Sequence, residues 1–157
     1  MREKLLHASG CTFATAVSAD YGDKIYAFCA DCKVDEAGNL EFIVTSPETI
    51  SGITGHISET EAALTFEDEV LAFPPLAEGE VSPVMAPWLF IHTLRSGYLT
   101  ACGADADGYK LILDDSYANE ALQLEVYLDN DQKPVSCDIL WSGRRVLSIK
   151  ITNFEYL

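Results

Sequence analysis

Alternation of apolar and polar residues with a period of two dominates the chain. Between Leu122 and Leu128 the apolar side chains fall on every second position. A strand that is buried on one face requires this pattern, because successive side chains of a strand point to opposite faces. Further runs of this kind are Thr12 to Ala19, Lys24 to Val34, Leu40 to Thr45, Ala62 to Phe66, Tyr98 to Ala104, Tyr109 to Leu113, Val135 to Trp141 and Val146 to Thr152. The pattern predicts about nine strands.

Short links rich in Asp, Asn and Gly separate many of these runs. Such links form the turns of β-hairpins, and consecutive hairpins build an antiparallel sheet. One face of an antiparallel sheet can stay in water, which agrees with acidic residues at alternate strand positions. The links are Tyr21 to Asp23, Asp35 to Asn39, Asp105 to Gly108, Asp129 to Gln132 and Ser142 to Gly143.

One segment, Pro87 to Gly97, has the end signals of a helix. It follows a proline-containing connection, Phe73 to Gly79. Its proline and Arg95 stand in the first and last turns, and its glycine stands beyond the end, where these residue types are favoured. Its apolar residues surround most of the circumference, so we expect the helix to be largely buried. A second, short helix over residues 1–9 leads into the first strand.

The composition indicates a globular domain with a strongly acidic surface. The chain has 157 residues, 48% of them hydrophobic, which suits a single domain over residues 1–157 with a packed core. Its 10 basic and 25 acidic side chains give a formal charge of −15. This charge argues against nucleic acid and anionic lipid surfaces as partners, while an apolar ligand stays allowed. No apolar run approaches the roughly 20 residues of a membrane span.

No arrangement of residues indicates a catalytic site or a cofactor. The sequence has no nucleophile elbow, phosphate-binding loop or zinc-binding helix motif, and its 3 histidines lie far apart. We therefore predict that the protein is not an enzyme, that it has no metal site and that it needs no cofactor. The 5 cysteines show no regular spacing, which leaves the redox compartment open.

Two short motifs have a chemical alternative. Cys29 and Cys32 have the spacing of a zinc or thiol-exchange pair, but residues three apart on a strand point to opposite faces, so we prefer structural thiols. The turn that ends at Gly108 resembles part of a calcium loop, yet Gly103 stands where the first carboxylate should be. A plain hairpin turn is the preferred interpretation there, and weak calcium binding is the alternative.

The remaining candidate site is the inner face of the sheet beneath the predicted helix. If the sheet curves, its apolar side chains line a concave face that can hold an apolar ligand. The alternative is that sheet and helix pack directly, so that the same residues form a filled core. The candidate ligand-binding residues are Phe28, Phe42, Val44, Trp88, Phe90, Ile91, Leu94, Leu124, Val126, Leu147 and Ile149.

The order of the predicted elements carries a family resemblance. An opening helix, a leading strand at Cys11 to Val17, hairpins that include Gly38 to Val44, and a proline-flanked helical insertion follow one another. The last third is the most distinctive, with Val126 to Asp129, Lys133 to Val135 and Gly143 to Phe154. In this order the chain resembles the LolA/LolB-like superfamily, the bacterial lipoprotein carriers, and especially its compact Gram-positive relatives.

The resemblance implies both a fold and a function. The fold is mainly β (α+β): a curved antiparallel sheet forming an unclosed half-barrel, with an N-terminal helix and a helical insertion that covers the concave face. The function is that of a noncatalytic, extracytoplasmic domain that binds a lipid or acyl chain in this face. We expect an exported protein, anchored as a lipoprotein through a signal upstream of Met1.

Some members of the superfamily bind partner proteins instead of cargo. The alternative function is therefore a cell-envelope interaction or regulatory module with a filled core. Such a module would engage a basic protein partner through its acidic surface or through an edge of the sheet.

Overall fold

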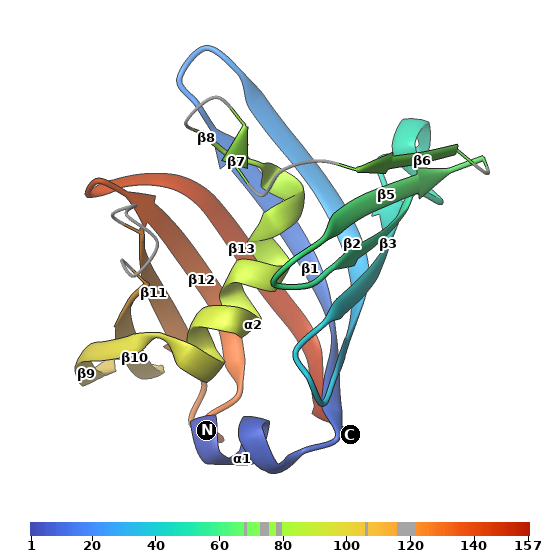
Figure 1. The fold of residues 1–157 in the computed structure, drawn as a ribbon. Helices are drawn as coiled ribbons and strands as arrows, with labels where there is room; N and C mark the ends of the chain where they lie inside the picture. Colours follow the sequence, from blue (N-terminus) through green and yellow to red (C-terminus); the bar gives the residue numbers. More distant parts are fainter. Residues whose placement is uncertain (68, 73–75, 78–79, 106, 116–121) are drawn as a thin grey trace.

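The computed structural model describes residues 1–67, 69–72, 76–77, 80–105, 107–115 and 122–157. Eleven strands form one antiparallel sheet that curves without closing (Figure 1). They are β1 (Gly10–Asp20), β2 (Ile25–Asp35), β3 (Leu40–Ser46), β4 (Thr54–Ile57), β5 (Ala62–Phe66), β6 (Glu69–Ala72), β9 (Tyr98–Asp105), β10 (Gly108–Asp114), β11 (Leu122–Leu128), β12 (Pro134–Trp141) and β13 (Arg144–Tyr156). The predicted fold class is confirmed.

The order of the strands places both ends of the chain at the centre of the sheet. That order is β6-β5-β4-β3-β2-β1-β13-β12-β11-β10-β9. The two edges, β6 and β9, therefore come from the middle of the chain, on either side of α2 (Ala86–Ser96). Because the chain leaves the sheet at one edge and returns at the other, α2 crosses the concave face (Figure 1).

The predicted strands are all present, and the structure adds two to the sheet that the alternation does not reveal. β4 has two inward positions, and one of them is Gly55, where a Cβ atom would lie 2.2 Å from the Phe42 ring. β6 is exposed along its whole length, so no alternation marks it. Short strands with missing or exposed side chains thus escape a search for periodicity.

The helix α2 is largely buried, as predicted, and it begins one residue before the predicted start. Phe90 is fully buried, and its ring meets Phe13 of β1 edge to face with centroids 5.8 Å apart. The helix ends at Ser96, and a Cβ atom on the next residue, Gly97, would lie 2.7 Å from the carbonyl oxygen of Thr93. Any residue with a Cβ atom at position 97 would collide with Thr93, so glycine is required where the chain turns into β9.

The first helix, α1 (Arg2–His7), is shorter than the predicted one and packs through Leu5, which is buried. In the predicted connection Phe73 to Gly79, residues 73–75 and 78–79 lie outside the described residues. Leu76–Ala77 form β7, which pairs with β8 (Glu80–Val81). Residue 106 of the predicted turn between β9 and β10 also lies outside them.

Candidate functional site

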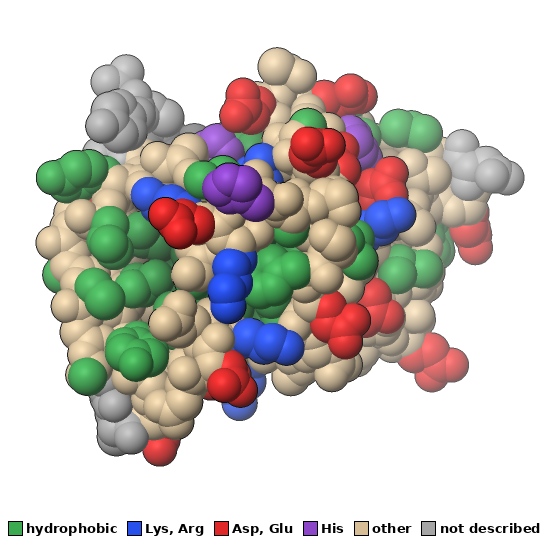
Figure 2. Space-filling view, turned by 90° about the horizontal axis from the view of Figure 1, so that it is seen from below, with side chains coloured by type: hydrophobic (Ala, Val, Ile, Leu, Met, Phe, Trp, Pro, Cys, Tyr) green, Lys and Arg blue, Asp and Glu red, His purple; other side chains and the backbone are tan. Residues whose placement is uncertain are grey.

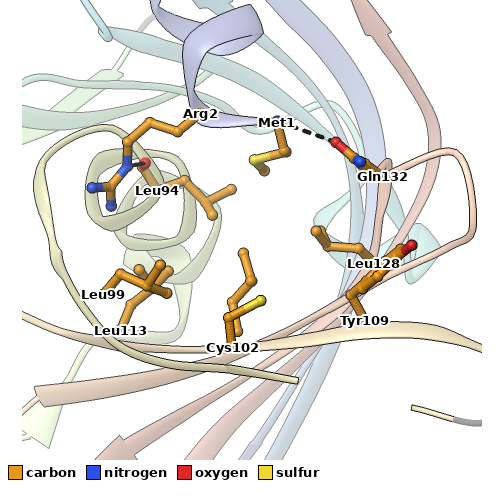
Figure 3. A pocket seen from close by; sticks show the side chains of 10 residues that line it. Met1, Arg2, Leu94, Leu99, Cys102, Tyr109, Leu113, Leu128 and Gln132 are labelled. Atoms are coloured by element: carbon orange, nitrogen blue, oxygen red, sulfur yellow. Dashed lines mark hydrogen bonds between the residues drawn. The ribbon is translucent and has the colours of Figure 1, made fainter. Parts of the chain in front are cut away.

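A pocket opens on the concave face beside the C-terminal end of α2 (Figure 3). Its volume is about 350 Å³. Pockets that hold small molecules measure about 300–1,000 Å³, so this one falls at the lower end of that range. The lining is mostly apolar and consists of Met1, Arg2, Leu94, Leu99, Cys102, Tyr109, Leu111, Leu113, Leu128 and Gln132.

The pocket lies where α2 stops covering the sheet. Leu113, Leu111 and Tyr109 occupy every second position of β10, and all three line the pocket. Leu113 is 1% exposed and is paired with Leu99. Leu99 follows Gly97, the residue after the helix, by two positions. Farther along β10 Leu111 is half-buried, and Tyr109 is 38% exposed. The inner wall is therefore dry beside the helix and open to solvent away from it.

A β-bulge places two residues of β9 on the wall of the pocket. Leu99 pairs with Leu113 and Ala101 pairs with Ile112, so one residue of β9 between them is extra. Without this extra residue Leu99 and Cys102 would point to opposite faces of the sheet. With it both line the pocket, and Figure 3 shows Cys102 projecting toward the centre.

The side chain of Arg2 joins α1 to the end of α2. Its Nε donates a hydrogen bond to the Leu94 carbonyl oxygen at 2.6 Å, and its Nη2 donates to the carbonyl oxygens of Gly97 at 2.6 Å and Thr93 at 3.3 Å. The last carbonyl groups of a helix have no partner within the helix and carry partial negative charge, which a guanidinium group satisfies. Arg2 thus fixes the end of α2 that forms one side of the pocket.

The apolar residues predicted to contact a ligand are all buried, each with 9% exposure or less. Leu94 also lines the pocket, whereas the other ten pack into the core between α2 and the sheet. For those ten, contact with a ligand stays a prediction. They are Trp88, Phe90 and Ile91 of α2, Phe28 of β2, Phe42 and Val44 of β3, Leu124 and Val126 of β11, and Leu147 and Ile149 of β13.

The other residues of the pocket wall are not among the predicted ligand-binding residues. Leu99, Cys102 and Tyr109 lie in strands that it predicted, and Leu111 and Leu113 continue the alternation of β10. The inward direction of Tyr109, Leu111 and Leu113 could have been found from that alternation. That of both Leu99 and Cys102 could not, because it depends on the bulge in β9. The exposure of these side chains could not be predicted from the sequence, because it depends on where α2 ends relative to the strands.

The cysteines separate into buried and accessible thiols. Cys32 is buried and Cys29 is half-buried, and they point to opposite faces of β2, as predicted. Burial raises the pKa of the Cys11 thiol to about 12, and it also raises the pKa values of Cys32 and Cys137. Because the thiolate is the reactive form, these three thiols are inert near neutral pH. Cys102 is exposed.

The histidines lie in three separate elements. His7 belongs to α1, His56 to β4 and His92 to α2. The ring of His92 stacks on Trp88 at a centroid distance of 4.5 Å. Among the described residues no group of three or more His, Cys, Asp or Glu side chains is placed to hold a metal ion.

Three solved structures have the same fold as this chain. A DUF1329 family protein from Desulfovibrio piger has a TM-score of 0.54 at 10% identity, with 99% of this chain and 88% of that chain covered. A putative outer membrane lipoprotein-sorting protein domain from Vibrio parahaemolyticus has a TM-score of 0.53 at 7% identity, with the same coverage of 99% and 88%. Lipoprotein LppX from Mycobacterium tuberculosis has a TM-score of 0.50 at 15% identity, with 96% and 87% covered.

The fold of this protein is therefore LolA-like, the class that the order of elements in the sequence resembles. No protein-family model matches the sequence, and a comparison with curated proteins finds no match. In the part of the chain that the structure describes, no helix has both the length and the apolar character needed to span a membrane.

Proposed function

We propose that this protein is a noncatalytic binding protein that takes an apolar ligand, such as an acyl chain, into the pocket beside the end of α2. The observation that carries the proposal is the pocket itself, about 350 Å³ in volume, with leucine at five of its ten lining positions. Because a water molecule occupies roughly 30 Å³, the pocket has space for on the order of ten waters. Such waters would find few polar partners there, so an apolar ligand gains by replacing them.

The wall of the pocket combines buried leucines with side chains that reach solvent. Leu94, Leu113 and Leu128 are buried, whereas Leu99, which is paired with Leu113, and Tyr109, which is paired with Leu128, are exposed. Seen from below, hydrophobic side chains gather along the left side, where β9 and β10 lie in Figure 1 (Figure 2). An acyl chain would place its tail against the leucines and its polar end toward solvent.

Fluorescence titration tests the proposal directly. The probes are cis-parinaric acid and its uncharged methyl ester, added to the purified protein. We expect saturable binding of both probes, with the ester bound at least as tightly, because the protein is strongly acidic and repels a carboxylate. If neither probe gives a saturable signal, the result contradicts the proposal.

Two matched variants locate the site. Cys102→Trp puts a large side chain at a residue that lines the pocket. Ala101→Trp adds the same side chain to the neighbouring residue, which lines a depression on the outer face, where Cys102 also contributes, and does not line the pocket. We expect Cys102→Trp to weaken binding at least about tenfold and Ala101→Trp to leave it near the wild-type value. Equal binding by the two variants would show that the probe sits elsewhere.

The proposed site of action is the bacterial cell envelope, outside the cytoplasm. The LolA-like fold supports this location, since two of the similar structures are a lipoprotein and a putative lipoprotein-sorting domain. Fractionation of the native cells, with detection of the untagged protein, tests it. Recovery only in the cytoplasmic fraction would contradict it, and metabolic labelling with a fatty acid tests for a lipoprotein anchor.

A further inference from the structure

The edge strand β9 is unusual in its composition and its exposure. It is one of the two edges of the sheet, and its seven residues from Tyr98 to Ala104 are all exposed. None of these seven residues is charged, although 22% of the residues in the whole chain are charged. No described residue pairs with the outer side of this strand.

Edge strands of soluble proteins are normally protected against pairing with other chains. Short length, charged side chains and bulges are the usual means of protection. The opposite edge, β6, has four residues and begins with Glu69. In β9 the bulge affects only the end near Tyr98, and from Ala101 to Asp105 the register with β10 is continuous. This stretch of backbone is open to an additional strand.

The outer face beside this stretch can receive side chains of an added strand. Ala101 and Gly103 line a depression of about 470 Å³ together with Lys110, Ile112 and Tyr127 of the neighbouring strands. A Cβ atom built on Gly103 would meet no atom within 4 Å. In recognition by strand addition, backbone hydrogen bonds provide affinity and depressions of this kind select alternate side chains. The small residues of β9 therefore favour apolar side chains in the partner.

The two ends of β9 are acidic. Asp107 follows the strand in the turn, while Asp114 lies opposite Tyr98 at the other end. Lys110 is the only Lys or Arg of β9 and β10, and its Nζ lies 2.7 Å from Oε2 of Glu125. A formal charge of −15 disfavours a second copy of this chain as the occupant and favours a basic partner.

We infer that the edge of β9 binds an extended peptide segment of a partner protein as an additional strand. The segment has an uncharged, apolar centre that pairs with the Ala101–Asp105 stretch, and it carries Lys or Arg on both sides of this centre, next to the acidic ends of β9. This interaction uses the backbone edge and the outer face of the sheet, so it does not depend on a ligand in the pocket.

Peptide selection tests the chemistry of the partner. A display library of random peptides is selected on the wild-type protein and counter-selected on Gly103→Lys, which adds a positive charge at the edge where no atom is in the way. We expect enrichment of peptides with apolar residues at alternate central positions and Lys or Arg on both flanks. Enrichment of acidic peptides, or no enrichment over the counter-selected pool, would overturn the inference.

The binding site of a selected peptide is then measured by fluorescence anisotropy and amide hydrogen exchange. We expect Gly103→Lys to weaken binding at least about tenfold, added salt to weaken it, and the amides of β9 to become protected. Val70→Lys on the opposite edge strand is the matched control, because Val70 is 70% exposed, and should bind as the wild type does. An equal loss of peptide affinity in both variants, or protection of amides outside β9 instead of those in β9, would overturn the assignment to β9.

Sedimentation of the protein alone distinguishes the partner peptide from a second copy. We expect a monomer in both the wild type and Gly103→Lys. A wild-type dimer that Gly103→Lys dissociates would overturn the inference, because the edge would then be occupied by β9 of another copy.

Discussion

The inner face of the sheet has a covered region and an open region, although the strands of both carry apolar side chains that point inward. Leu124 and Val126 of β11 lie in the covered region and are fully buried. Leu99 and Tyr109 lie in the open region on β9 and β10, and 45% and 38% of their surface is exposed. The strand pattern thus determines which side chains point inward, whereas the path of α2 determines which of them are buried.

The path of α2 follows from the order of the strands. The chain crosses from the β6 edge to the β9 edge, and the helix must end before β9 begins. The last turn of α2 therefore lies beside β9 and β10 and leaves part of their inner face uncovered. The covered region provides the stability of the fold, and the open region provides the candidate ligand site and the free edge.

The largest expected effect is a contrast between the two regions in the cost of removing an apolar side chain. Phe90→Ala removes a fully buried ring that contacts Phe13, and we expect it to lower the free energy of unfolding by about 3–5 kcal/mol. Leu99→Ala, in the open region, should lower it by less than about 1 kcal/mol. Urea denaturation measures both. Similar losses in the two variants would mean that the open region is packed as tightly as the covered one.

A second contrast concerns the bonds that hold the end of α2 at the boundary of the regions. Arg2→Met keeps an apolar side chain but removes the hydrogen bonds to three carbonyl oxygens. We expect a loss of about 1–2 kcal/mol in unfolding free energy and faster amide exchange in the last turn of α2. Lys4→Met changes an exposed residue of the same helix and serves as the control. Unchanged exchange in Arg2→Met would show that the end of α2 is held by packing alone.

The sequence is sufficient to predict nine of the eleven strands of the sheet, but not the pocket. The run from Leu122 to Leu128 was predicted with the observed bounds, because one buried and one solvent-facing side impose a period of two on it. The pocket depends on contacts between residues that are distant in sequence. Arg2 bonds to residues more than 90 positions away, and the bulge between Leu99 and Ala101 appears only when β9 is paired with β10.

The smallest expected effect is a difference between two thiols at alkaline pH. Cys11 lies buried in the covered region, and burial raises its pKa from 9.0 to about 12, whereas Cys102 is exposed in the open region. Because the pKa of Cys11 is higher in the folded state, its contribution to stability is fully present below pH 9 and is lost as the pH rises toward 12. Between pH 9 and pH 10 we expect a loss of about 1 kcal/mol from this group.

Urea denaturation of matched variants across this pH range isolates the contribution of Cys11. Cys11→Ala should show a shallower fall in unfolding free energy than the wild type, whatever its stability at neutral pH. Cys102→Ala, at an exposed position, is the control for loss of a cysteine. Since the two substitutions remove the same chemical group, the difference in slope measures burial of the thiol and no other property of cysteine. Parallel slopes in all three proteins would mean that water reaches Cys11, and that the covered region opens more readily than its packing implies.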